Sequence, residues 1–239
     1  MDVKTVEIPV TVLDANGRYV TGLHPDDFSL YEEDRLQKIG GFTKDSRSVQ
    51  VLLLLDLSRS VQSYSKSIKK AARQFVNYFS REDSLAVIGF AQGLMPIQDW
   101  TTDKKRIAKA IGKLETGTQT QLYDAVQSAM DKSMERLSGR KACLLITDGI
   151  DTSSESTLKS LQKSIYRRET AIYAINILRA VKGGMERYRR VGYVARIMER
   201  LGEENYLEKF FLKKEEEMDR LALSSGGRAF FTDNMEKMY

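Results

Sequence analysis

The chain has 239 residues, enough to bury one substantial core but too few for two equal domains. Hydrophobic residues make up 41% of it and charged residues 30%, which is typical of globular rather than disordered proteins. The net charge of +5 comes without a groove motif of interleaved basic and aromatic residues, so we expect no nucleic-acid partner. No apolar run approaches the ~18 residues of a membrane span, so we expect no transmembrane segment in this sequence.

The first 48 residues predict a small unit rich in β structure. Residues 6–12 alternate between apolar and polar side chains, and residues 14–17 have the composition of a turn. Further short strands and one capped helical turn follow, the strands at 18–20, 28–31 and 37–42 and the turn at 24–28. We expect this unit to pack on, or extend, a main domain over residues 49–239.

From residue 49 onward, apolar strands alternate with amphipathic helices. Residues 49–55 form a continuous apolar run, which is typical of a central parallel strand buried on both faces. Later strands are expected at 85–90, 95–100, 141–147, 171–178 and 228–231, and helices at 68–79, 104–113, 122–137 and 158–166. A charged, mainly helical stretch covers 181–223, of which 181–214 looks like an insertion. This order predicts an α/β fold: a doubly wound, mainly parallel, Rossmann-like sheet flanked by helices.

Polar residues follow two of the buried strands. In such a fold, ligands bind beyond the carboxyl ends of the strands, where the strand order reverses. Asp56, Ser58 and Ser60 follow the first apolar strand, and Asp148 follows the strand that ends at Thr147. A buried carboxylate is costly to leave unpaired, so two that converge indicate a cation between them, unless they only cap the helices that follow. Oxygen donors without His or Cys favour Mg²⁺, with Mn²⁺ or Ca²⁺ as alternatives.

This set of residues resembles a known metal site. Asp56-x-Ser58-x-Ser60, a distal threonine, and Asp148 in Thr-Asp-Gly are similar to the metal-ion-dependent adhesion site of von Willebrand A and integrin I domains. The resemblance runs from about residue 49 to 231. It implies that the two serine hydroxyls bind the ion directly and that the aspartates do so directly or through water.

The threonine ligand has two candidates. Related families often read Gly-Gly-Thr-Ala-Leu-Tyr-Asp-Ala, and aligning this pattern on residues 122–125 places the ligand at Thr120. Thr118 is the alternative, because the sequence here reads Gly-Thr-Gln-Thr over residues 117–120. In the resemblance, this threonine alternates between direct and water-mediated contact with the ion.

The N-terminal unit has a resemblance of its own. Residues 10–23 and 27–32 look like the leader region of bacterial "VWFA-related" proteins, described especially from Acidobacteria. Many of these proteins carry signal peptides. The resemblance therefore implies an exported protein, in the periplasm or at the cell surface, whose leader is missing from this sequence; a cytoplasmic location stays open.

The function implied by the resemblance is Mg²⁺-dependent binding of a protein partner, or adhesion, through an Asp or Glu side chain of that partner. We expect no enzyme, because His24 is the chain's one histidine and Cys143 lies in the middle of a strand. Two alternatives remain: a metal-assisted hydrolase or phosphotransferase, and a scaffold component of a larger assembly.

Several further residues are candidates for supporting roles. Asp124, Asp151 and Thr118 could tune the metal site from behind its ligands, although aspartates at such positions more often cap helices. A second group of basic residues could contact the partner, unless it is simply a solvated surface: Arg59, Arg187, Arg189 and Arg190.

Overall fold

The computed structural model describes residues 22–43, 48–135, 137–165, 170–185 and 205–234, together with ten single residues, 8, 10, 12, 14, 15, 20, 197, 198, 200 and 202. The chain divides into two compact units, residues 1–46 and residues 47–239.

The first unit contains a two-stranded antiparallel sheet. A short 3₁₀ turn, η1 (Pro25–Asp27), precedes strands β1 (Leu30–Glu32) and β2 (Arg35–Gln37), which pair antiparallel. The expected strand at 37–42 is misplaced, because β2 ends at Gln37 and no strand follows it among the described residues of this unit. The expected strands at 6–12 and 18–20 lie largely outside the described residues, although the Val20 N–H donates to the Val12 carbonyl at 2.9 Å.

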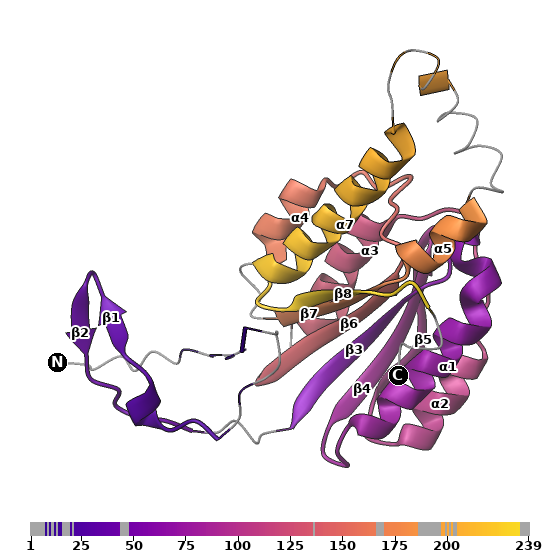
Figure 1. The fold of residues 1–239 in the computed structure, drawn as a ribbon. Helices are drawn as coiled ribbons and strands as arrows, with labels where there is room; N and C mark the ends of the chain where they lie inside the picture. The colour runs from indigo at the N-terminus through magenta and orange to yellow at the C-terminus, as the bar shows by residue number, and fades with distance from the viewer. Residues whose placement is uncertain are drawn as a thin grey trace. The chain divides into compact units, whose positions relative to one another are not determined.

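The second unit is built on a six-stranded sheet in the order β5-β4-β3-β6-β7-β8 (Figure 1). All neighbouring strands are parallel except β5, which runs antiparallel to β4. The strands are β3 (Val49–Asp56), β4 (Ser84–Ala91), β5 (Gly93–Thr101), β6 (Arg140–Thr147), β7 (Thr170–Asn176) and β8 (Arg228–Phe231). The predicted fold class, a mainly parallel Rossmann-like sheet flanked by helices, is confirmed.

Helices cover both faces of this sheet (Figure 1). One face packs against α1 (Ser65–Tyr78), α2 (Lys104–Gly112) and α5 (Leu178–Met185), and also against η2 (Arg59–Tyr64). The other face packs against α3 (Leu122–Ala129), its π-helical extension η3 (Met130–Met134), α4 (Leu158–Ile165) and α7 (Tyr206–Ser224).

The apolar run of β3 follows from this double cover. Val51, Leu53 and Leu55 contribute to the core under α1 and α2. Leu52 and Leu54 point the opposite way and contribute to the core under α3 and η3. Successive side chains of a strand face opposite sides, so a strand with helices on both sides must be apolar at every position.

Two boundaries differ from the sequence interpretation. β7 stops at Asn176, before the expected 178, because the Asn176 side-chain carbonyl accepts a hydrogen bond from the Leu178 N–H at 2.8 Å and α5 begins at Leu178. Helix α7 begins at Tyr206, inside the segment 181–214 that was expected to be an insertion. Residues 186–196 of that segment lie outside the described residues.

Asp83 ties the start of the central strand to the turn before β4. Its carboxylate accepts hydrogen bonds from the Val49 N–H at 2.9 Å and the Ser80 N–H at 2.6 Å. Burial alone would raise the pKa of Asp83, but these bonds, together with the Ser80 hydroxyl, outweigh it and lower the pKa below the ordinary value of 3.8. The carboxylate is therefore held in its charged form in the folded state.

We expect Asp83→Asn to lower the free energy of unfolding by about 1–3 kcal/mol at neutral pH, because hydrogen bonds to a charged acceptor are lost. The lowered pKa means that the stabilisation is complete above pH 3.8, the ordinary value, and is lost as the pH falls below it. Urea unfolding of both proteins at several pH values measures this difference. Glu82→Gln, at the exposed neighbouring position, is the control; an equal loss of stability in it would contradict the assignment.

Candidate metal centre

The carboxyl ends of β3 and β6 meet where the strand order reverses. After β3 the chain continues to β4 and β5 on one side, and it returns to the other side of β3 with β6. Asp56 is the last residue of β3, and Asp148 directly follows β6. Both carboxylates are completely buried, so the topology brings two acidic groups together at one edge of the sheet.

Local hydrogen bonds orient the Asp56 carboxylate. Its Oδ1 accepts from the Ser58 N–H at 2.9 Å, and its Oδ2 accepts from the Thr147 hydroxyl at 2.6 Å. Thr147 was not among the residues singled out from the sequence. The strand register explains its position. Leu55 pairs with Ile146, so the next residues on the two strands, Asp56 and Thr147, lie side by side.

The two serines lie in contact with each other and with the second aspartate. The hydroxyls of Ser58 and Ser60 are 2.9 Å apart, and Ser60 lies close enough to Asp148 to lower the pKa of its carboxyl. Ser58 is buried, whereas Ser60 is half-buried at the start of η2. The structure therefore brings Asp56, Ser58, Ser60 and Asp148 into one cluster.

The surroundings of this cluster disfavour the simultaneous ionisation of both aspartates. Burial raises the pKa of Asp56, and the hydrogen bonds from Ser58 and Thr147 only partly counter it. Burial also raises the pKa of Asp148, and the charge of the neighbouring Asp56 raises it further. Two adjacent buried carboxylates with raised pKa values are costly to keep charged together, and a bound cation or a proton shared between them would relieve that cost.

Thr120 and Thr118 differ sharply in their surroundings. Thr120 is buried and Thr118 is exposed. The loop that carries them is fixed to the ends of β3 and β4, because the Gly117 N–H donates to the Leu57 carbonyl at 2.6 Å and the Gln121 N–H donates to the Ala91 carbonyl at 2.9 Å.

The main chain of Thr120 is also joined to the loop after Asp148. Its carbonyl accepts from the N–H groups of Thr152 and Ser153, and its N–H donates to the Thr152 hydroxyl. These bonds use only the main chain of Thr120, and its hydroxyl stays the predicted ligand.

The chemistry of these side chains fits a hard cation. Asp148 Oδ2 is buried and has no hydrogen-bond partner, which is costly for a carboxylate oxygen unless something else binds it. The remaining donors are hydroxyl oxygens, and the described residues contain no group of three or more His, Cys, Asp or Glu that could hold a metal by themselves. A set of two carboxylates and several hydroxyls suits Mg²⁺ better than zinc or copper.

Asp124 and Asp151 have clear structural partners. Asp151 accepts from the Leu122 N–H at 2.8 Å at the start of α3, and it also binds the hydroxyl of Ser154. Asp124 accepts from the N–H groups of residues 155 and 156 at 2.8 and 2.9 Å. Both carboxylates therefore fasten the loop after Asp148 to α3, and a tuning role at the metal site stays a prediction.

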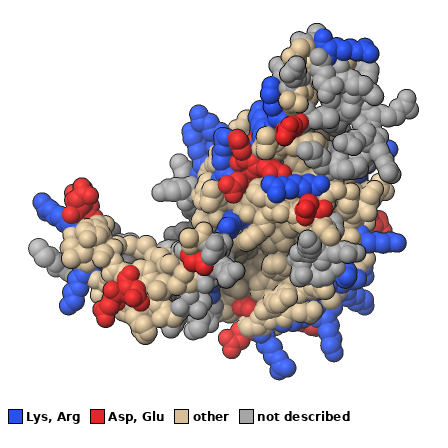
Figure 2. Space-filling view, viewed as in Figure 1, with Lys and Arg blue, Asp and Glu red and all other residues tan. Residues whose placement is uncertain are grey.

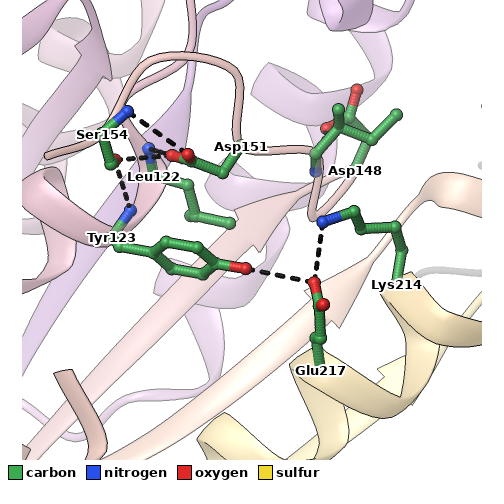
Figure 3. A network of polar contacts seen from close by, with 8 residues as sticks. Leu122, Tyr123, Asp148, Asp151, Ser154, Lys214 and Glu217 are labelled. Carbon is green, nitrogen blue, oxygen red and sulfur yellow. Dashed lines mark hydrogen bonds and ion pairs between the residues drawn. The ribbon is translucent and has the colours of Figure 1, made fainter. Parts of the chain in front are cut away.

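Helix α7 lies directly against the turn that holds Asp148 (Figure 3). Gly149 has a φ of 76°, and a Cβ added there would lie 2.8 Å from Asn176 Nδ2 and 3.2 Å from Met218 Cε. Beside this contact, the Lys214 ammonium group donates to Glu217 at 2.7 Å, and the Tyr123 hydroxyl donates to the same Glu217 oxygen at 3.1 Å. The sequence does not reveal this network, because Tyr123 and Glu217 are 94 positions apart.

The proposed partner surface is only partly described. Arg59 is exposed in η2, next to the serine cluster. Arg187, Arg189 and Arg190 lie outside the described residues. Of the two residues weighed as nucleophilic or basic groups, His24 is exposed in the first unit, and burial raises the pKa of the Cys143 thiol in β6 to about 12.

Comparison with known proteins identifies the fold. The family described as von Willebrand factor type A domain matches residues 51–150. No curated protein matches the chain.

Several solved structures resemble the chain. A von Willebrand factor type A protein from Catenulispora acidiphila has a TM-score of 0.57 at 14% identity, covering 81% of this chain and 40% of that one. Proximal thread matrix protein 1 from the mussel byssus has a TM-score of 0.57 at 16% identity, covering 80% and 43%. The conserved hypothetical protein BatB from Bacteroides thetaiotaomicron gives 0.47 at 17% identity, covering 54% and 67%. The chain thus spans about two fifths of the first two proteins, and at these identities the likeness concerns the fold.

We expect Gly149→Ala to destabilise the protein more than Gly139→Ala. Both glycines have a positive φ, 76° and 86°, which costs a non-glycine residue roughly 1–2 kcal/mol. Only at Gly149 would the new methyl group also meet buried atoms, whereas Gly139 has none within 4 Å. Thermal unfolding of the two variants measures the difference; equal shifts would show that α7 yields to the extra group.

Proposed function

We propose that this chain binds a protein partner through a Mg²⁺ ion, and the premise is its von Willebrand factor type A domain over residues 51–150. This fold is commonly used in protein–protein interaction and adhesion. The ion would be held by Asp56, Ser58, Ser60, Thr120 and Asp148. The partner would supply a carboxylate from an Asp or Glu side chain.

The observation that carries the proposal is the unpartnered Oδ2 of Asp148, buried beside the equally buried Asp56. The hydrogen bonds of Asp56 fix its carboxylate in one orientation, so this residue is preorganised rather than adjustable. The serine hydroxyls, in contact with each other, add neutral oxygens on the same side. Such a cluster is stabilised by a cation more than by any neutral group.

The neutrality of the hydroxyl donors determines what the site can do. A bound Mg²⁺ would keep much of its charge and an open coordination position, to which a carboxylate of another molecule would be attracted. Ser60 is half-buried in the first turn of η2, so the cluster borders the surface on the side of this turn. A partner's acidic side chain would approach from there.

No observation favours the enzymatic alternative. Domains of this type are generally interaction modules, and the described residues beside the cluster include no histidine or thiol that could act as a base or nucleophile. An assembly component that uses the site for docking would share the same carboxylate chemistry. The proposal therefore rests on recognition, with Mn²⁺ or Ca²⁺ as alternative ions.

The location of the protein remains a prediction. Among the described residues, no helix has the length and apolar character needed to cross a bilayer. We propose an extracytoplasmic protein, at the cell surface or in the periplasm, on the strength of the resemblance of the N-terminal unit to exported bacterial proteins.

The metal site is tested by Asp148→Asn. In chelator, we expect this variant to be at least as stable as the wild type, because it removes one of two adjacent buried negative charges. Added Mg²⁺ should stabilise the wild type, by about 2.7 kcal/mol at a free concentration of ~100 Kd, and should not stabilise the variant. Thermal unfolding with and without Mg²⁺ measures both effects, and calorimetry measures the affinity.

Thr120→Val and Thr118→Val form the matched pair for this test. The exposed Thr118 should tolerate the change with unaltered Mg²⁺ affinity, whereas Thr120→Val should weaken it. A wild-type protein whose unfolding does not respond to Mg²⁺, Mn²⁺ or Ca²⁺ would contradict the proposed site.

Partner binding is tested by immobilising the wild type and Asp56→Ala and passing over them a cell-envelope extract of the source organism. We expect a partner that is retained in Mg²⁺, released by EDTA and absent from the variant. The retained protein should lose binding when its contacting Asp or Glu is replaced by the corresponding amide. Retention that is undiminished in EDTA would instead support a metal-independent scaffold.

A further inference from the structure

Helices α1 and α2 carry many basic residues and no acidic residue. Each helix contains four Lys or Arg residues, and Lys113 forms the C-cap of α2. The basic residues are Lys66, Lys69, Lys70 and Arg73 on α1 and Lys104, Lys105, Arg106 and Lys109 on α2. The eight positive charges on this pair of helices thus exceed the net charge of +5 of the whole chain.

The two helices lie antiparallel, and basic side chains join them. The Lys69 ammonium group donates to the Leu114 carbonyl at 2.6 Å, so the start of α1 is beside the end of α2. At the other end, the Lys104 ammonium group donates to the carbonyls of Asn77 and Phe79. These two lysines are half-buried and serve the fold.

The other basic side chains are exposed, although Arg73 also donates to the Ala108 carbonyl at 3.2 Å. The two helices bury their apolar sides in one core, which leaves their polar sides on a common outer surface. The exposed members are Lys66, Lys70, Arg73, Lys105, Arg106, Lys109 and Lys113. With α1 about 21 Å long and paired helices ~8–10 Å apart, these side chains form a broad basic surface, here called the α1–α2 face.

The two faces of the sheet differ in their charge. Helix α7, which packs on the opposite face, carries both signs, and several of its charged residues pair with one another: the acidic Glu208, Glu215, Glu216, Glu217 and Asp219 and the basic Lys209, Lys213, Lys214 and Arg220. Figure 2 shows Lys and Arg side chains projecting along the margin where α1 and α2 lie in Figure 1. The α1–α2 face thus has a single sign of charge, which attracts a polyanionic surface.

The residue types indicate which polyanion fits. Only Arg73 and Arg106 are arginines, whereas protein interfaces are enriched in Arg and depleted of Lys. Single-stranded nucleic acids require aromatic side chains among the basic ones, but the aromatic residues of α1 gather at one end, at Phe75, Tyr78 and Phe79. A lipid surface needs only charge density over a broad area.

Tyr78 supports the same choice. It is 78% exposed at the end of α1, where Lys104 joins the two helices. Tyrosine is enriched at membrane–water interfaces, where the ring enters the headgroup region and the hydroxyl stays hydrated. An exposed aromatic ring at the edge of a lysine-rich surface is typical of peripheral membrane binding.

We propose that the α1–α2 face binds the surface of a membrane rich in anionic phospholipids. The lysine ammonium groups contact headgroup phosphates as point charges, and Tyr78 inserts at the interface. Since α1 and α2 cover one face of the sheet, this contact leaves the carboxyl edge with Asp56 and Asp148 open.

The test compares two charge reversals of equal size. Lys105→Glu/Lys109→Glu alters α2, and Lys159→Glu/Lys163→Glu alters α4, which packs on the other face of the sheet. Both pairs are exposed and occupy the second and sixth positions of their helices. Each variant loses the same net charge, so only the place of the charge differs between them.

Binding is measured by co-sedimentation with vesicles of phosphatidylcholine, with or without phosphatidylglycerol. We expect the wild type to bind only the anionic vesicles and to dissociate as salt is raised, since the Debye length is only ~10 Å at 0.1 M. The α2 variant should lose binding at least about tenfold, and the α4 variant should bind like the wild type. Unchanged thermal midpoints confirm that both variants are folded.

Three outcomes would overturn the proposal. The first is that anionic vesicles fail to bind the wild type at low salt. The second is that both variants lose binding equally, which would indicate net charge rather than this surface. The third is tighter binding to single- or double-stranded DNA than to vesicles, lost in the α2 variant, which would assign the surface to nucleic acid. None of these depends on Mg²⁺, so the test is independent of the metal site.

Discussion

Two carboxylates buried at the end of adjacent strands set the main constraint on this domain. Asp56 and Asp148 are completely buried, and their charges oppose each other. Much of the surrounding structure lowers the free-energy cost of burying these two charges. The Ser58 N–H and the Thr147 hydroxyl bind Asp56, the loop with Thr120 is tied to the strand ends, and α7 closes over Gly149. A cation bound here would remove the remaining cost of holding two buried negative charges together. The residues that destabilise this edge of the sheet are therefore the ones that would make it suitable for binding a cation and a partner.

The two sides of the sheet use charge differently. On α7, opposite charges are paired at short range, as in the contacts of Lys214 with Glu217 at 2.7 Å and of Arg220 with Glu216 at 3.0 Å. On α1 and α2, exposed charge of one sign faces outward, and Lys69, Arg73 and Lys104 also donate to backbone carbonyls of or next to the neighbouring helix. The edge with Asp56 and Asp148 lies between these two sides, at the ends of the strands. The proposed carboxylate-binding site and the proposed membrane-binding face therefore occupy separate parts of one small domain.

The fold was predictable because β3 must be apolar at each position from Val51 to Leu55 if helices cover both faces, and such a run is visible in sequence. The cluster at the sheet edge was predictable for a related reason, since the polar residues directly follow these runs. Contacts between residues that are distant in the sequence could not be predicted. The Thr147 hydroxyl bond depends on strand register, and the Tyr123–Glu217–Lys214 network depends on where α7 packs. The end of β7 also escaped prediction, because a side-chain bond of Asn176 starts a helix inside an apolar stretch.

The position of the Asp56–Thr147 bond has a consequence for how the domain folds. The two residues are 91 positions apart, and β4, β5 and three α-helices lie between their strands in the sequence. Closing so long a loop costs entropy before any contact offsets it, and such non-local pairings slow folding. The oxygen cluster therefore exists in no fragment and in no partly folded form that lacks either strand. A ligand of this cluster therefore binds only the folded domain. Its binding stabilises the whole domain against unfolding rather than one segment of the chain.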